Sequence, residues 1–154
     1  MKIVLDTNVL MSGIFFRGNP HRILQSWRAD RLQLVVSTEI LAEYAEVAER
    51  LAAEFGLGEA ETTIALMATR AEIVAAPQLP TQVCDDPDDD KFLACAVAAQ
   101  VSIVISGDKA LRRASGYRDV EVLAPRQFVD AHLREQAAKA DTGKAHRGQR
   151  ADEE

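Results

Sequence analysis

Short apolar runs recur along the chain and predict buried strands. Four runs stand out, at residues 2–5, 32–36, 101–105 and 120–123, and a weaker run covers residues 73–75. Turn-forming or polar residues bound each run, and the runs have the length of strands rather than of helices. The pattern therefore predicts five short strands.

The segments between these runs show the wider spacing of apolar residues that is typical of helices. Prolines stand near the predicted first turns, and glycines at positions 56 and 58 mark a break. Helices are predicted over residues 9–16, 20–30, 38–55, 59–70, 87–100, 109–113 and 125–138.

This alternation of strands and helices predicts an α/β sandwich with a mostly parallel central sheet. We expect one domain over residues 1–139. From residue 140 onward the chain is rich in charged and polar residues and has no apolar periodicity. Residues 140–154 are therefore predicted to form a flexible polar tail.

Composition narrows the classes of function. The chain has 154 residues and is 47% hydrophobic, which suits one domain with a buried core. Its net charge of −6 argues against a protein that covers nucleic acid broadly and without sequence specificity. Two cysteines and three histidines predict neither a disulfide framework nor a zinc site. No apolar run approaches the length of a membrane span, and Asp6 interrupts the first one, so we expect a cytosolic protein without a membrane segment.

Two aspartates follow predicted strands directly. Asp6 comes after residues 2–5, and Asp108 comes shortly after residues 101–105. Ligands of open parallel sheets bind outside the carboxyl ends of the strands, which favours a functional role. Each aspartate alone could equally cap the helix that follows it.

A glutamate on the helix at residues 38–55 is predicted to point inward. At about 100° per residue, Glu43 lies roughly 60° from the centre of the apolar stripe, whereas Glu39 and Glu46 lie roughly 100–120° away. The alternative is an ion pair at the helix boundary, for example with Arg50. The stripe itself consists of Ile40, Tyr44, Val47 and Leu51.

The acidic run at residues 86–90 is the strongest chemical signal. Four of its five residues are aspartates, and an apolar helix follows at once. Asp86 is the predicted N-cap, Asp89 projects toward the apolar face, and Asp90 projects roughly 110° away. A buried carboxylate is costly unless a cation or hydrogen-bond donors meet it. We therefore predict Asp89 as a metal ligand and keep Asp90 as the alternative.

Asp6, Glu43, Asp89 and Asp108 together form a predicted metal-holding set. Carboxylates are the ligands that Mg²⁺ and Mn²⁺ prefer, and four of them can hold one or two such ions. These ions polarise a phosphate and lower the pKa of bound water. The sequence thus favours a metal-dependent nuclease that needs no covalent nucleophile.

These motifs resemble those of the PIN-domain nucleases over about residues 1–130, nearly all of the ordered chain. The resemblance rests on the order and spacing of the runs at residues 4–9, 37–43, 86–93 and 104–108. The third run resembles the branch that comprises toxins of prokaryotic toxin–antitoxin pairs. One departure is Asp90, where this branch often carries a neutral amide.

The resemblance implies a three-layer α/β/α sandwich and Mg²⁺- or Mn²⁺-dependent cleavage of single-stranded RNA. It implies the same four acids as the site, with Asn8 and Ser106 as supporting polar residues. It also implies a cognate antitoxin protein as partner and a homodimer.

Two alternatives remain open at this point. A phosphatase of the haloacid-dehalogenase type also has an aspartate after its first strand, but it needs a second aspartate where this chain has Asn8. A non-catalytic module could keep the fold and bind RNA or a protein. Basic side chains that could frame an RNA site are Arg17, His21, Arg28, Arg31, Arg112, Arg113 and Arg126.

Overall fold

A single five-stranded sheet forms the centre of the protein, whose computed structural model describes residues 1–56 and 58–134. The strand order is β3-β2-β1-β4-β5, and every neighbouring pair is parallel. This confirms the predicted parallel sheet. The strands are β1 (Lys2–Leu5), β2 (Gln33–Ser37), β3 (Glu72–Val74), β4 (Ile103–Ile105) and β5 (Glu121–Leu123).

The order in which strands are added to the sheet reverses at β1. It first adds β2 and β3 on one side, and it then crosses over to place β4 and β5 on the other. Leu5 pairs with Ile105, and the Asp6 amide donates to the Ile105 carbonyl at 2.9 Å, so β1 and β4 end at the same level. Such a switch point leaves a crevice at the carboxyl ends of the strands, where ligands of open sheets bind.

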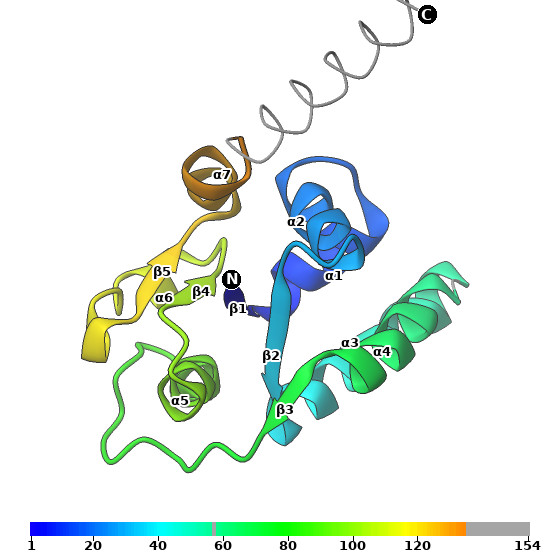
Figure 1. The fold of residues 1–154 in the computed structure, drawn as a ribbon. Helices are drawn as coiled ribbons and strands as arrows, with labels where there is room; N and C mark the ends of the chain where they lie inside the picture. Colours follow the sequence, from blue (N-terminus) through cyan, green and yellow to red (C-terminus); the bar gives the residue numbers. More distant parts are fainter. Residues whose placement is uncertain (57, 135–154) are drawn as a thin grey trace, which may run out of the picture.

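Helices cover both faces of this sheet, which confirms the predicted three-layer sandwich. In Figure 1, α5 lies below the sheet, where it contacts β1, β2, β3 and β4, and α1, α2 and α7 lie above it. Helix α3 packs against its neighbour α4. The helices are α1 (Thr7–Phe15), α2 (Asn19–Arg28), α3 (Thr38–Phe55), α4 (Glu59–Arg70), α5 (Asp90–Ala99), α6 (Lys109–Arg112) and α7 (Pro125–Phe128).

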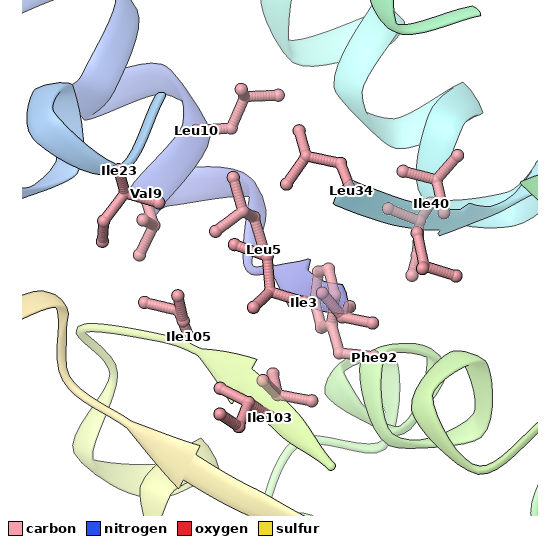
Figure 2. Packing of buried hydrophobic residues seen from close by; sticks show 14 of the residues in the cluster. Ile3, Leu5, Val9, Leu10, Ile23, Leu34, Ile40, Phe92, Ile103 and Ile105 are labelled. Atoms are coloured by element: carbon pink, nitrogen blue, oxygen red, sulfur yellow. The ribbon is translucent and has the colours of Figure 1, made fainter. Parts of the chain in front are cut away.

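The core lies between the sheet and these helices. Figure 2 shows Ile3 and Leu5 of β1 among side chains of β4 and α5, including Phe92. Burying one such side chain contributes about 1.5–3 kcal/mol, so the ends of β1 and β4 are held firmly. Trp27 of α2 is 2% exposed and belongs to the same core.

Close contact between α1 and α2 fixes the helix that follows Asp6. Gly13 is buried, and a Cβ atom at this position would lie 2.8 Å from the Pro20 carbonyl oxygen. A side chain there would force the two helices apart, because that distance is shorter than a van der Waals contact.

Several boundaries differ from the prediction. The helix predicted from residue 87 begins as a 3-10 turn (Pro87–Asp89), since the Asp86 carboxylate accepts the Asp88 amide at 2.9 Å and tightens this turn. The last predicted helix continues from α7 as a π-helical turn (Val129–Leu133). The predicted domain limit at residue 139 and the tail at 140–154 lie outside the described residues. In the part of the chain that is described, no helix is long and apolar enough to cross a membrane.

Candidate active site

Asp6 lies at the carboxyl end of β1 and is only 7% exposed. The hydroxyl of Ser106, a fully buried residue that follows β4, donates to Asp6 Oδ2 at 2.7 Å. Burial raises the pKa of Asp6, and the hydrogen bond from Ser106 partly opposes that shift. Ser106 therefore holds this carboxylate in place and stabilises its charge.

The same serine, Ser106, also positions Asp108. The Asp108 amide donates to Ser106 Oγ at 3.0 Å, and Asp108 Oδ1 accepts the Ala110 amide at 2.9 Å. Asp108 is thus an N-cap of α6, as one of the two interpretations predicts. Its second oxygen has no donor among the described residues, so capping leaves it available to a ligand.

The neighbours Asp89 and Asp90 differ sharply in their surroundings. Asp90 Oδ1 accepts the Cys84 amide at 2.7 Å and Oδ2 accepts the Val83 amide at 3.1 Å, so both oxygens anchor the preceding loop. The half-buried Asp89 carboxylate has no donor in the part of the chain that is described. Burial, followed by the charges of Asp6 and other aspartates, raises the pKa of Asp89 to about 6. This geometry favours Asp89 over Asp90 as a ligand.

α-Helical spacing extended back from Phe92 predicts that Asp89 projects toward the apolar face. Asp89 lies instead in the 3-10 turn, where the rotation per residue is larger. The apolar residues from Phe92 to Ala96 are also buried on all sides rather than on one face. Only this part of α5 is enclosed, since Ala98 near the end of the helix is exposed.

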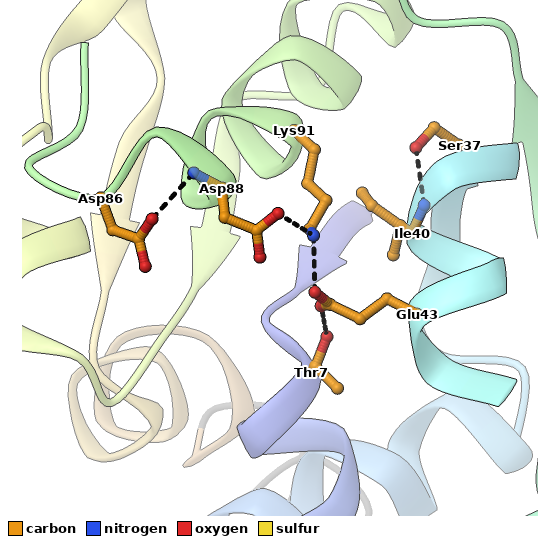
Figure 3. A network of polar contacts seen from close by, with 7 residues as sticks. All are labelled: Thr7, Ser37, Ile40, Glu43, Asp86, Asp88 and Lys91. Atoms are coloured by element: carbon orange, nitrogen blue, oxygen red, sulfur yellow. Dashed lines mark hydrogen bonds and ion pairs between the residues drawn. The ribbon is translucent and has the colours of Figure 1, made fainter. Parts of the chain in front are cut away.

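Glu43 comes from α3 and meets two donors, as Figure 3 shows. The Thr7 hydroxyl donates to Glu43 Oε2, and Lys91 Nζ lies 2.5 Å from Glu43 Oε1. The adjacent Tyr44 hydroxyl donates to the Leu5 carbonyl and so fixes α3 to the end of β1. The ion pair of Glu43 is therefore with Lys91 and not with Arg50.

Sequence reasoning missed Thr7 and Lys91. Each is bound to Glu43 across a long separation along the chain, 36 and 48 positions respectively. Helical spacing within one element cannot reveal such contacts. A lysine directly after an acidic run and before an apolar helix was the available signal.

Asn8 lies exposed in the first turn of α1. Together with Ser12, Gly107 and Asp108 it lines a shallow cavity of about 390 Å³. Of the two predicted supporting residues, Ser106 thus contacts two of the acids, whereas Asn8 faces the open space beside Asp108.

The four predicted acids gather at one edge of the sheet. Asp108 and Glu43 both raise the pKa of Asp6, and Asp6 and Asp108 both raise that of Asp89, in each case after burial. Among the described residues, however, no three His, Cys, Asp or Glu side chains converge closely enough to hold a metal ion as they stand. The carboxylate oxygens nevertheless have the chemistry that a hard divalent cation requires.

Several of the basic side chains that could frame an RNA site already have hydrogen-bond or ion-pair partners within the chain. Arg28 donates to Thr63, Arg113 pairs with Asp85, and Arg126 lies 3.9 Å from Asp130. Arg112 on α6 differs, because its Nε atom is buried and has no hydrogen-bond partner in the described part. A phosphate contact by Arg112 stays a prediction.

Comparison with known proteins yields a family and a fold. A family model described as the PIN domain matches residues 2–110. An uncharacterized protein of Methanocaldococcus jannaschii, MJ1680, is 27% identical over 141 residues, which cover 84% of this chain and 90% of that protein.

Two solved structures share the architecture. VapBC2 from Rickettsia felis, bound to a DNA fragment from its promoter, aligns with a TM-score of 0.58 and 14% identity over 80% of this chain and 98% of that one. VapBC-1 from nontypeable Haemophilus influenzae aligns with a TM-score of 0.52 and 17% identity over 82% and 99% of the two chains. At these identities the likeness is one of fold.

Proposed function

This chain belongs to the PIN domain family, and from that premise we propose that it is an endoribonuclease that uses Mg²⁺ or Mn²⁺ to cleave single-stranded RNA. PIN domains are generally nucleases and usually use divalent metals. The observation that carries the proposal is the gathering of Asp6, Glu43, Asp89 and Asp108 at the switch point between β1 and β4.

In this proposal the four carboxylates would bind the metal ion, and neighbouring polar side chains would keep the carboxylates in position. After burial, the charges of Asp108 and Glu43 raise the pKa of Asp6, and those of Asp6 and Asp108 raise the pKa of Asp89. Asp6 and Asp89, with Asp108 beside them, would therefore form the side that most needs a cation, with Glu43 as the fourth acid. Ser106 fixes the Asp6 carboxylate and the Asp108 backbone, and Asn8, which lines the same cavity as Asp108, would orient a metal-bound water. The ion, when bound, supplies polarisation of the phosphate and an acidified water.

The family assignment sets aside the haloacid-dehalogenase phosphatase. It agrees with the chemistry, because Asn8 stands where that phosphatase needs its second aspartate. A non-catalytic module that binds RNA or a protein would have the same PIN fold. A cleavage experiment distinguishes that alternative from the enzyme.

We also propose that the enzyme is the toxin of a toxin–antitoxin pair, forms a homodimer and acts in the cytosol on cellular RNA. The support is the likeness of its fold to VapBC toxin–antitoxin complexes. Light scattering during gel filtration would give the dimer mass, and expression would arrest growth until the partner protein is co-expressed. A monomer that leaves growth unaffected would refute this part of the proposal.

The test of the nuclease is cleavage of an end-labelled single-stranded RNA with Mg²⁺, with Mn²⁺ and with chelator. We expect fragments only with metal, and none from Asp6→Asn. Glu46→Gln, on the exposed face of α3, is the matched control and should cleave like the wild type. Binding of RNA without cleavage under either metal would replace the enzyme with the non-catalytic module.

A further inference from the structure

Lys91, at the start of α5, places a buried ammonium group beside the acids. Its Nζ atom lies 2.5 Å from Glu43 Oε1 and 3.1 Å from Asp88 Oδ1, and its side chain is only 7% exposed. Burying an ammonium is costly unless carboxylates surround it. The proposed metal centre thus already contains one cation that belongs to the chain (Figure 3).

The contacts hold this cation in position. The Thr7 hydroxyl fixes the other oxygen of Glu43, and Asp88 lies within the 3-10 turn (Pro87–Asp89) that precedes α5. Two carboxylate oxygens, Glu43 Oε1 and Asp88 Oδ1, lie within 3.1 Å of Nζ and stabilise its positive charge. The ammonium therefore stays charged and bridges α3 and α5.

The two sides of the centre consequently differ in their need for metal. Glu43 has a lysine and a hydroxyl on its oxygens, whereas Asp89 has no donor and Asp108 has one free oxygen among the described residues. A second ion held by Glu43 would stand directly against the ammonium, because Lys91 Nζ lies 2.5 Å from Glu43 Oε1. Like charges at such close range repel strongly.

We propose that Lys91 takes the place of a second divalent ion, so that the centre binds a single ion on the side of Asp6, Asp89 and Asp108. Lys91 is then a positioning residue, and Glu43 serves as its partner rather than as a ligand of that ion. The inference rests on the proposed function, since it specifies how many ions the nuclease uses.

Counting bound Mn²⁺ without RNA tests this directly. Free Mn²⁺ is measured by electron paramagnetic resonance during titration of the full-length, metal-stripped protein. We expect one ion per chain for the wild type and for Lys91→Arg, and a second, weaker ion for Lys91→Met. Lys2→Met is the matched control, since Lys2 pairs with Glu72 far from the acids, and it should bind one ion.

Two ions in the wild type, or one ion in a folded Lys91→Met protein, would overturn the inference. Should Lys91→Met fail to fold, Glu43→Gln decides, because it keeps the shape of the side chain and the lysine. We expect its Mn²⁺ affinity to stay within about threefold of the wild type, whereas Asp89→Asn loses about tenfold or more. Equal losses would make Glu43 a metal ligand and overturn the inference. No Mn²⁺ binding to the wild type would instead remove the proposed metal centre itself.

Discussion

The acidic edge of the sheet has two halves that consist of the same kind of side chain but differ in what meets the charge. On the β1–β4 side, Asp6 and Asp108 share one serine hydroxyl, and Asp89 has no donor among the described residues. On the α3–α5 side, Glu43 is held by Thr7 and Lys91. The first half is short of positive charge and the second is not. This difference indicates where a divalent ion would add most stabilisation.

The largest expected effect comes from the half that lacks a cation. Asp6→Asn should reduce RNA cleavage by about 10²–10³-fold or more, the scale for losing one electrostatic group at a reacting centre. The fold should persist, because the amide oxygen can still accept the Ser106 hydroxyl. Rate measurements with saturating Mn²⁺ check this, with circular dichroism as the control for folding. Full activity in this variant would contradict the placement of a divalent ion on the β1–β4 side.

Ser106→Ala should have the next largest effect. It removes the donor to Asp6 and the acceptor of the Asp108 amide, and losing such a supporting contact typically costs about 10–100-fold in activity or metal affinity. The unpaired amide should also destabilise the protein by about 1–3 kcal/mol. Cleavage rates and urea unfolding measure the two effects separately. A change in stability alone would make Ser106 a purely structural residue.

The raised pKa of Asp89 predicts how pH acts on the first half. Burial and neighbouring acids place this pKa at about 6, so below that pH a proton competes with the metal, and Mn²⁺ affinity should fall by up to about tenfold per pH unit. Titrations between pH 5 and 8 check this, and Asp89→Asn should flatten the profile.

Stability without metal should change in the opposite sense. Because the folded pKa lies above the ordinary value of 3.8, the folded state binds more protons between those two values, and this group's contribution to stability falls as pH rises through about 6. Metal-free Asp89→Asn should therefore melt above the wild type at pH 8 and approach it near pH 4. A constant difference across this range would count against the assignment.

The smallest effect on cleavage is expected at Asp90, the residue next to Asp89. Asp90→Asn keeps one acceptor oxygen but turns an NH2 donor toward the other of the Val83 and Cys84 amides, which loses its partner. This should cost about 1–3 kcal/mol of unfolding free energy, while cleavage stays within about threefold of the wild type. Thermal melts and cleavage rates check it. A large loss of activity with unchanged stability would make Asp90 the ligand instead.

The fold could be predicted largely from the sequence because short apolar runs and helical periodicity follow directly from burial. The 3-10 turn Tyr117–Asp119 was missed, since Arg118 and Asp119 adopt positive φ angles that non-glycine residues rarely take. At the site, the predicted acids do gather at one edge. Their partners Lys91 and Thr7 could not be predicted, because those contacts depend on how α5 and α1 pack against α3.

The most direct test of the central claim is the rate at which a single-stranded RNA is cleaved as a function of Mn²⁺ concentration, for the wild type and for Asp89→Asn. We expect no cleavage in chelator, a wild-type rate that saturates with Mn²⁺, and a curve for Asp89→Asn that is shifted to about tenfold more metal or lost. Cleavage that persists in chelator, or identical curves for the two proteins, would contradict a metal centre built on these acids.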